Sequence, residues 1–314
     1  MTALRTALDT ALDRTVLPGY SRIGYLVRRT SWPADDPRPD ALRGRTAIVT
    51  GASSGLGKAT ALGLARLGAT VRLAVRNLDK GRTALADIER EVPGAELVLD
   101  RCDVSDLEDV RRYAKELEAG QIHVLVHNAG VMPPKRALSP QGHELTLATH
   151  VLGPLLLTDL LRPKLAGGRV ILIASGGMYT QQLPTEDPEY RNDPYRGATA
   201  YARSKRIQVA LTPLLATRLA PDNITVATMH PGWSDTPGLT SSLPLFTKLT
   251  RPLLRTPAEG ADTTVWLAAT TPEPPTGKFW HDRQPRPTHY LARTQESPAD
   301  RQHIWQYCLD ATGL

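Results

Sequence analysis

Two side chains four residues apart, Tyr201 and Lys205, are the residues of this sequence best suited to moving a proton. On a helix, residues at i and i+4 share a face, so the phenol and the ammonium would point into the same space. A free tyrosine titrates near pH ~10, and a neighbouring cation lowers its pKa by favouring the charged form. We therefore expect Tyr201 to act as a general acid and base. Because this spacing also occurs on ordinary exposed helices, the surrounding sequence must decide.

A serine follows an apolar run upstream of this pair. Residues 170–174 have the composition of a buried strand, and Ser175 comes directly after them. Open α/β sheets bind ligands at the carboxyl ends of their strands. The Ser175 hydroxyl is therefore expected to donate a hydrogen bond to a substrate carbonyl oxygen. Considered alone, a serine that merely begins a loop would be the favoured interpretation.

A glycine-rich turn near the start of the chain offers a site for a phosphate-bearing cofactor. An apolar run at residues 46–49 is followed by Thr50, by three closely spaced glycines and by a helical pattern. Glycines let the backbone turn sharply and approach a pyrophosphate, and a helix N-terminus offers unpaired N–H groups and a positive dipole end. The order strand, turn, helix predicts a dinucleotide site. Its contacting residues are expected to be Gly51, Ser53, Ser54, Gly55, Leu56 and Gly57.

The end of the second expected strand bears on which dinucleotide binds. An enzyme that uses NAD usually has an acid here for the ribose 2′-hydroxyl, whereas the 2′-phosphate of NADP calls for a cation. This position is Arg76, which favours NADP over NAD. The alternative is an arginine that is simply solvated.

Strand and helix patterns alternate from Arg45 onward, as in a parallel sheet covered on both faces. The predicted fold class is α/β, with a single Rossmann-type, doubly wound parallel sheet of about seven strands over residues 45–314. An N-terminal helical extension and linker occupy residues 1–44. The expected strands are residues 46–49, 70–75, 96–99, 122–126, 169–174, 225–229 and 277–280.

The extension has its own pattern. Leu4, Leu8, Leu12 and Val16 recur at helical spacing, and residues 32–39 have the composition of a linker. We expect an amphipathic helix docked on the chain's own domain. The alternative is a surface that makes peripheral contact with a membrane or binds a partner chain.

Composition limits the classes of partner and compartment. The 314 residues carry a formal net charge of +6, but the basic residues are scattered among acids, so we expect no nucleic-acid partner. Two cysteines cannot form a disulfide framework, which favours a reducing compartment, by default the cytoplasm. No apolar run approaches the ~18 residues needed to span a bilayer. We also expect no metal site.

Taken together, the motifs resemble the short-chain dehydrogenase/reductase family over about residues 45–281. The glycine turn, residues 128–130 after the fourth strand, Ser175, and Tyr201 with Lys205 follow one another in the family's order. The resemblance implies an oxidoreductase in which Tyr201 exchanges a proton with the substrate oxygen, Ser175 orients that oxygen, and Lys205 holds the nicotinamide ribose and lowers the tyrosine pKa. It also implies cofactor contacts beyond the glycine turn, from Arg76, Asp103, Val104, Asn128, Ala129, Gly130, Tyr201, Lys205, Pro231, Gly232, Trp233 and Thr236.

Two positions depart from the family pattern. His127 stands where the family's N-N-A-G motif begins, and His150 stands where an asparagine usually completes a proton relay. His150 could replace that relay through a water, which makes it a further candidate catalytic residue, or it could simply pack. If the relay is lost, the chain would be a non-catalytic NADP-binding sensor on the same scaffold, which is the alternative to an enzyme.

The substrate is expected to be a small lipophilic carbonyl or alcohol. Ser175 and Tyr201 are roughly twice as far apart in sequence as in many family members, which resembles the retinol-dehydrogenase-like branch. The extra loop is expected to wall an apolar pocket with Met178, Tyr179, Pro184 and Tyr195, together with residues 239–246. The family also suggests a homodimer through the helix that bears Tyr201.

Overall fold

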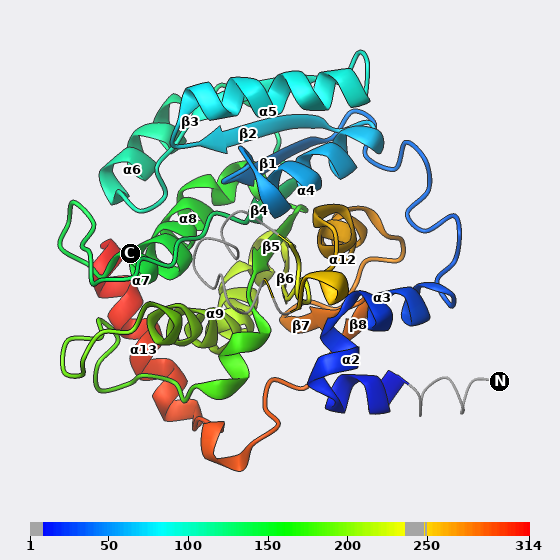
Figure 1. Ribbon diagram of the computed structural model, residues 1–314. Helices are drawn as coiled ribbons and strands as arrows, with labels where there is room; N and C mark the ends of the chain where they lie inside the picture. Colours follow the sequence, from blue (N-terminus) through cyan, green and yellow to red (C-terminus); the bar gives the residue numbers. More distant parts are fainter. Residues whose placement is uncertain (1–8, 236–247, 249) are drawn as a thin grey trace.

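The apolar runs expected to be strands lie side by side in one sheet (Figure 1). The structure is a computed structural model that describes residues 9–235, 248 and 250–314. The strands it describes follow the spatial order β3-β2-β1-β4-β5-β6-β7-β8, and every pairing is parallel except that of β7 with β8. Their bounds are β1 Thr46–Thr50, β2 Thr70–Val75, β3 Leu97–Arg101, β4 Val124–His127, β5 Arg169–Ile173, β6 Thr225–Met229, β7 Lys278–His281 and β8 Gln284–Pro285.

The doubly wound α/β fold expected from the sequence is confirmed. The chain winds outward from β1 to β3 in one direction and from β4 to β7 in the other, so the strand order reverses between β1 and β4. Ligands of open α/β sheets bind outside the carboxyl ends of the strands at such a reversal. The expected seven strands all form, and the added β8 is a two-residue antiparallel strand that pairs Pro285 with Trp280 and Gln284 with His281.

Helices cover both faces of the sheet, as Figure 1 shows. Alternate residues of each central strand point to opposite faces: Ala47 and Val49 of β1 join one buried cluster, whereas Ile48 joins the other. One cluster includes α4 Gly55–Arg66, α5 Leu78–Glu91 and α12 Pro257–Ala269. The other includes α6 Leu107–Glu116, α8 Gly153–Leu165, α9 Gly197–Leu219 and α13 Pro298–Thr312. Shorter helical turns are α7 Leu145–Leu147, Ala148–Leu152, Gly176–Thr180, Ala220–Asp222, Arg251–Leu253 and Ala292–Thr294.

The N-terminal extension is helical and packs on the domain beside β7 and β8 (Figure 1). Leu4 and Leu8 lie outside the described residues, and the remainder is three short helices, residues 9–14, α2 Val16–Tyr20 and α3 Arg22–Arg29. The buried Arg28 donates to Asp282, 2.8 Å away, just after β7. The described part of the extension therefore docks on the chain's own domain through Arg28, and an amphipathic helix that includes Leu4 and Leu8 stays a prediction. Turns and bends fill residues 30–44, which include the predicted linker over residues 32–39.

The opposite face of α3 is open to solvent. Ile23, Leu26 and Val27 are exposed there, next to Arg22 and Arg29. In the described part of the chain, no helix has the length and apolar character needed to cross a membrane. The same residues contain no group of three or more His, Cys, Asp or Glu side chains placed to hold a metal ion.

Candidate functional site

The turn between β1 and α4 has the geometry of an anion site. Gly51 and Gly55 have φ of +66° and +54°, a region that favours glycine. Ser54 occupies the N-cap of α4, yet its side chain makes no capping hydrogen bond, and no acidic residue lies in the first turn. The N-caps of α5, α6, α12 and α13 are all satisfied by a side chain. The start of α4 therefore keeps the free N–H groups and dipole that suit a pyrophosphate.

The loop after β4 is tied to this turn. The Nδ2 of Asn128 donates to the Thr50 carbonyl at 3.0 Å, and the backbone N–H groups of Asn128 and Ala129 donate to Thr50 Oγ1. A Cβ at Gly57 would lie 2.3 Å from Asn128 Nδ2, and one at Gly51 would lie 2.7 Å from the Ala129 Cα. These two glycines thus allow the two loops to pack directly, and Asn128 fixes the shape of the turn.

Arg76 and Asp103 lie close together where β2 and β3 end. The Arg76 side chain is 65% exposed, and its Nε is 3.8 Å from an Asp103 carboxylate oxygen. The other oxygen of Asp103 accepts from the backbone and hydroxyl of Ser105, so the carboxylate is held in place. Val104 is buried beside them. Arg76 can therefore turn toward an added anion without leaving a buried site.

Ser175 and Tyr201 meet at the carboxyl end of β5. Ser175 follows that strand after Ala174, its Oγ accepts from the N–H of Gly177, and α9 presents the half-buried Tyr201 toward it. Burial raises the pKa of Tyr201 above its ordinary value, while a side-chain hydrogen bond with Ser175 acts in the opposite direction and lowers it. The two hydroxyl-bearing residues thus lie together at this edge of the sheet, and their catalytic roles stay predictions.

Lys205 lies close to Tyr201 and is held by the backbone of β5. Lys205 is buried, and its Nζ donates to the Ile173 carbonyl at 2.6 Å and lies 5.6 Å from the centre of the Tyr201 ring. Burial lowers the pKa of Lys205 itself to about 7. The pKa of Tyr201 is raised, with no contribution from the lysine. Tyr201 and Lys205 thus share a face of α9, as their i and i+4 spacing requires, and the acidification of the phenol by the lysine and a bound nicotinamide stays a prediction.

His150 is fully buried, and both ring nitrogens have protein partners. Nε2 accepts from the Val131 N–H at 3.0 Å, so the proton resides on Nδ1, which donates to Ser204 Oγ at 2.7 Å. Ser204 in turn donates to the Tyr201 carbonyl. The ring stands edge-on to the Tyr201 ring at 5.3 Å, and burial together with Lys205 holds its pKa well below the ordinary value. Both ring nitrogens are thus engaged by the protein, and the proton relay through a water stays a prediction.

The segment Pro231–Trp233 follows β6 and completes the same edge of the sheet. Gly232 has φ of +71°, and its N–H donates to the His230 ring at 3.0 Å. The Trp233 N–H donates to the Tyr20 carbonyl at 2.8 Å, and its own carbonyl accepts from the Arg255 N–H at 2.7 Å. Of the expected cofactor residues, Thr236 lies outside the described residues.

Three side chains of the extra loop after Ser175 make packing contacts in the described part of the chain, and its role as a wall of the substrate pocket stays a prediction. Met178 is fully buried and Tyr179 nearly so, and the Tyr179 hydroxyl donates to the Pro287 carbonyl. The Tyr195 hydroxyl donates to Glu144. These side chains are engaged in packing, Pro184 is half-buried, and residues 239–246 lie outside the described residues.

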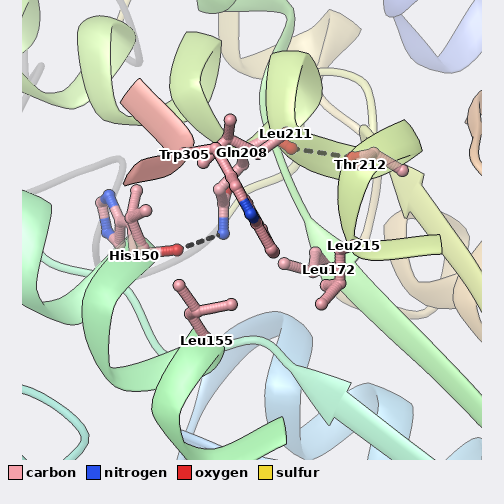
Figure 2. A pocket seen from close by; sticks show the side chains of 9 residues that line it. His150, Leu155, Leu172, Gln208, Leu211, Thr212, Leu215 and Trp305 are labelled. Atoms are coloured by element: carbon pink, nitrogen blue, oxygen red, sulfur yellow. Dashed lines mark hydrogen bonds between the residues drawn. The ribbon is translucent and has the colours of Figure 1, made fainter. Parts of the chain in front are cut away.

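A small cavity lies behind His150, among α8, α9 and α13 (Figure 2). Its volume is about 20 Å³, and leucines, Gln208 and Trp305 line it. Gln208 Nε2 donates to the His150 carbonyl, whereas its Oε1 has no partner. This space suits one water molecule and is too small for an organic substrate.

Sequence reasoning missed a buried cluster from the extension and the last strands. Tyr20, Arg28, Arg255 and Asp282 are nearly inaccessible, and they converge beside the Pro231–Trp233 segment. Their positions in the sequence are up to 262 residues apart (Tyr20 to Asp282). No local spacing could have indicated that they meet.

Known proteins with similar sequences and folds are dehydrogenases and reductases. A family model described as short chain dehydrogenase matches residues 45–244. Dehydrogenase/reductase SDR family member 12 from Bos taurus is 40% identical over 91% of this chain and 91% of its own length. Retinol dehydrogenase 12 from Homo sapiens is 32% identical over 87% and 88%. A Beutenbergia cavernae crystal structure with NADP bound at low occupancy gives a TM-score of 0.58 at 28% identity, covering 74% and 92%. The branch expected from the sequence is confirmed.

Proposed function

This chain belongs to the short-chain dehydrogenase family, and from that premise we propose that it is an NADP(H)-dependent oxidoreductase acting on a lipophilic carbonyl or alcohol. The observation that carries the proposal is the proximity of Ser175 and Tyr201 at the carboxyl edge of the sheet, close enough for Ser175 to act on the tyrosine pKa. The uncapped start of α4 opens at this same edge, since parallel strands end together. A proton donor and an anion site thus share one side of the molecule.

The residues of the site have separate tasks in this proposal. The free N–H groups at the start of α4 hold the pyrophosphate, and Asn128 keeps the turn in shape. When bound, the dinucleotide supplies or takes up the hydride. Ser175 donates to the substrate oxygen and orients it, and Tyr201 gives that oxygen a proton, a role worth about 10²- to 10⁴-fold in rate.

Carbonyl reduction requires Tyr201 in its protonated form. The raised pKa of Tyr201 means that the phenol keeps its proton at neutral pH, which is the form that donates to a developing alkoxide. Lys205 has a pKa of about 7 and binds the Ile173 carbonyl, so it anchors the end of β5 from α9. His150 fixes the Val131 backbone and the Ser204 hydroxyl beneath Tyr201 and serves as a positioning residue.

The preference for NADP is supported by Arg76. Its guanidinium is mostly exposed at the end of β2, and its contact with Asp103 is long enough to be exchanged for a phosphate. A guanidinium binds phosphate oxygens through charge-assisted hydrogen bonds that are stronger than neutral ones. The Beutenbergia structure that resembles this chain contains NADP.

Oxidation of NADPH in the presence of a panel of apolar aldehydes and ketones tests the proposal. Wild-type protein should consume NADPH with at least one of them, and Tyr201→Phe should bind NADPH equally but lose turnover. Binding of NADPH without any turnover by the wild type would instead identify the non-catalytic sensor. Absence of dinucleotide binding would contradict both.

Peripheral membrane contact through α3 belongs to the same proposal. Ile23, Leu26 and Val27 form an exposed apolar face beside two arginines, as expected of a helix lying on an anionic bilayer. Sedimentation with phosphatidylserine vesicles, compared between wild type and Leu26→Glu, tests this. A cytoplasmic location and a homodimer through α9 remain predictions; two buried, unpaired cysteines, Cys102 and Cys308, accord with the former.

A further inference from the structure

Tyr20, which lies outside the matched family region, touches both segments that shape the proposed site. Its ring is only 3% exposed, and its Cε2 lies 2.7 Å from the point where a Cβ on Gly176 would stand. Gly176 directly follows Ser175 and begins the helical turn Gly176–Thr180 that Ser175 caps. The Tyr20 ring therefore rests against the backbone that orients the serine.

The same residue also holds the segment after β6. The Tyr20 carbonyl accepts from the Trp233 N–H at 2.8 Å. Its ring packs edge-on to His230 at 4.4 Å and to Trp233 at 6.3 Å between ring centres. One side chain from the extension thus spans the adjacent ends of β5 and β6, where the substrate and the nicotinamide are proposed to meet.

Tyr20 is itself held by a buried charged cluster. The carbonyl of the preceding Gly19 accepts from Arg28 at 2.8 Å and from Arg255 at 3.2 Å. Both guanidinium groups also donate to the Asp282 carboxylate, at distances of 2.6 to 2.9 Å. Their side chains are 4%, 1% and 2% exposed, so water does not weaken these contacts. The position of Tyr20 is therefore fixed relative to β7.

We propose that the N-terminal extension supports the active site, and that Tyr20 is a positioning residue that sets the orientation of Ser175 and of the Pro231–Trp233 segment. The expected effect of Tyr20 on turnover rests on the proposed function. The expected effect of Tyr20 on the backbone near Ser175 and Trp233 does not depend on that function. A displacement of about 1 Å at a catalytic group can cost about 10²-fold in rate. A displaced Tyr20 should accordingly lower kcat more than it changes KM for the substrate.

Three variants of the full-length chain separate positioning from general stability. Tyr20→Leu removes the ring, Tyr20→Phe keeps it, and Tyr113→Leu is the control. Tyr113 is 4% exposed on α6 and bonds to Asp100 of β3, at the opposite edge of the sheet. Each variant is assayed for kcat and KM with NADPH and a carbonyl substrate, for NADPH affinity by fluorescence, and for hydrogen–deuterium exchange.

Tyr20→Leu should lower kcat by about ten-fold or more while KM for the carbonyl changes by less than about three-fold. It should also weaken NADPH binding and speed amide exchange in residues 175–180 and 230–235. Tyr20→Phe should restore kcat to within about two-fold of wild type, and Tyr113→Leu should leave kcat and exchange at these residues unchanged. Wild-type kcat and exchange in Tyr20→Leu, or equal losses in Tyr113→Leu, would overturn the inference.

Gly176→Ala offers a second route if Tyr20→Leu folds poorly. The new methyl would meet the Tyr20 ring, so this variant should lose kcat, and the loss should shrink in the Gly176→Ala, Tyr20→Leu double variant. Additive effects would count against the contact. If wild type neither binds nor oxidises NADPH, the proposed function fails; the exchange data then test the inference alone.

Discussion

Mild acid should destabilise this protein by about 5 kcal/mol between pH 7.5 and pH 5.5, because four histidines are buried in the neutral form. His127, His150, His230 and His281 are at most 2% exposed. Burial lowers the pKa of His127 and of His281 to about 3, and that of His150 and His230 well below the ordinary value. In the unfolded chain each would titrate near pH ~6.5. The unfolded state therefore binds more protons as the pH falls, and the free energy of unfolding decreases.

The size of the effect follows from this difference. At pH 5.5 a histidine of unfolded pKa ~6.5 stabilises the unfolded state by about 1.4 kcal/mol, and at pH 7.5 by less than about 0.1 kcal/mol. Four such residues add to roughly 5 kcal/mol, which is comparable to the whole stability of many domains. Carboxylates with lowered pKa, such as Asp9 and Asp109, lose their contribution only below pH ~4.

Urea unfolding followed by tryptophan fluorescence at the two pH values measures this quantity. The matched variant is His127→Asn. The His127 ring is hydrogen-bonded to Thr158 Oγ1, and asparagine is the residue that begins the family's N-N-A-G motif. Whatever its absolute stability, its loss between pH 7.5 and 5.5 should be smaller than that of the wild type by about 1.4 kcal/mol. A wild-type loss below about 1.5 kcal/mol, or an unchanged loss in the variant, would refute the reasoning.

Three further predictions concern single residues. Arg76→Ala should raise KM for NADPH by roughly 10-fold or more and leave KM for NADH unchanged; retained NADPH preference in steady-state assays would remove Arg76 from the cofactor site. Asp282→Asn should lower the free energy of unfolding in urea by about 3–5 kcal/mol, because two buried guanidinium groups lose their counter-charge. The control Asp79→Asn, in an exposed pair with Arg82, should lower it by less than about 1 kcal/mol. Equal losses in the two variants would contradict the buried network. His150→Asn should lower stability by about 1–3 kcal/mol because Val131 N–H or Ser204 loses its partner, without raising kcat; a large rise in kcat would mean that the histidine impairs a relay.

Most of the fold could be predicted from local patterns in the sequence. Apolar runs of strand length separated by helical patterns predict a parallel sheet, and seven of the eight described strands lie at or within two residues of the expected ones. The last strand, β8, could not be predicted from periodicity because it has two residues and ends in Pro285. The position of Ser175 after an apolar strand also indicates the ligand-binding edge of the sheet, and the family resemblance adds Tyr201 to it.

Tertiary contacts decided the rest of the site. The spacing of Tyr201 and Lys205 predicts a shared helix face, but it does not indicate that the lysine also binds the Ile173 carbonyl on β5. The protonation of His150 is set by the Val131 N–H. Tyr20 reaches the site only because charged residues distant in sequence meet on Asp282. Such pairings depend on the assembled sheet and leave no trace in local spacing.

The central claim is that the Tyr201 hydroxyl delivers the proton to a carbonyl oxygen beside a bound nicotinamide. Its most direct test is a single-turnover experiment in which preformed NADPH complexes of wild type and Tyr201→Phe, shown to bind NADPH equally, are mixed with the best carbonyl substrate. The claim predicts rapid loss of NADPH absorbance in the wild type and a rate lower by about 10²-fold or more in the variant. Equal rates for the two proteins would contradict it.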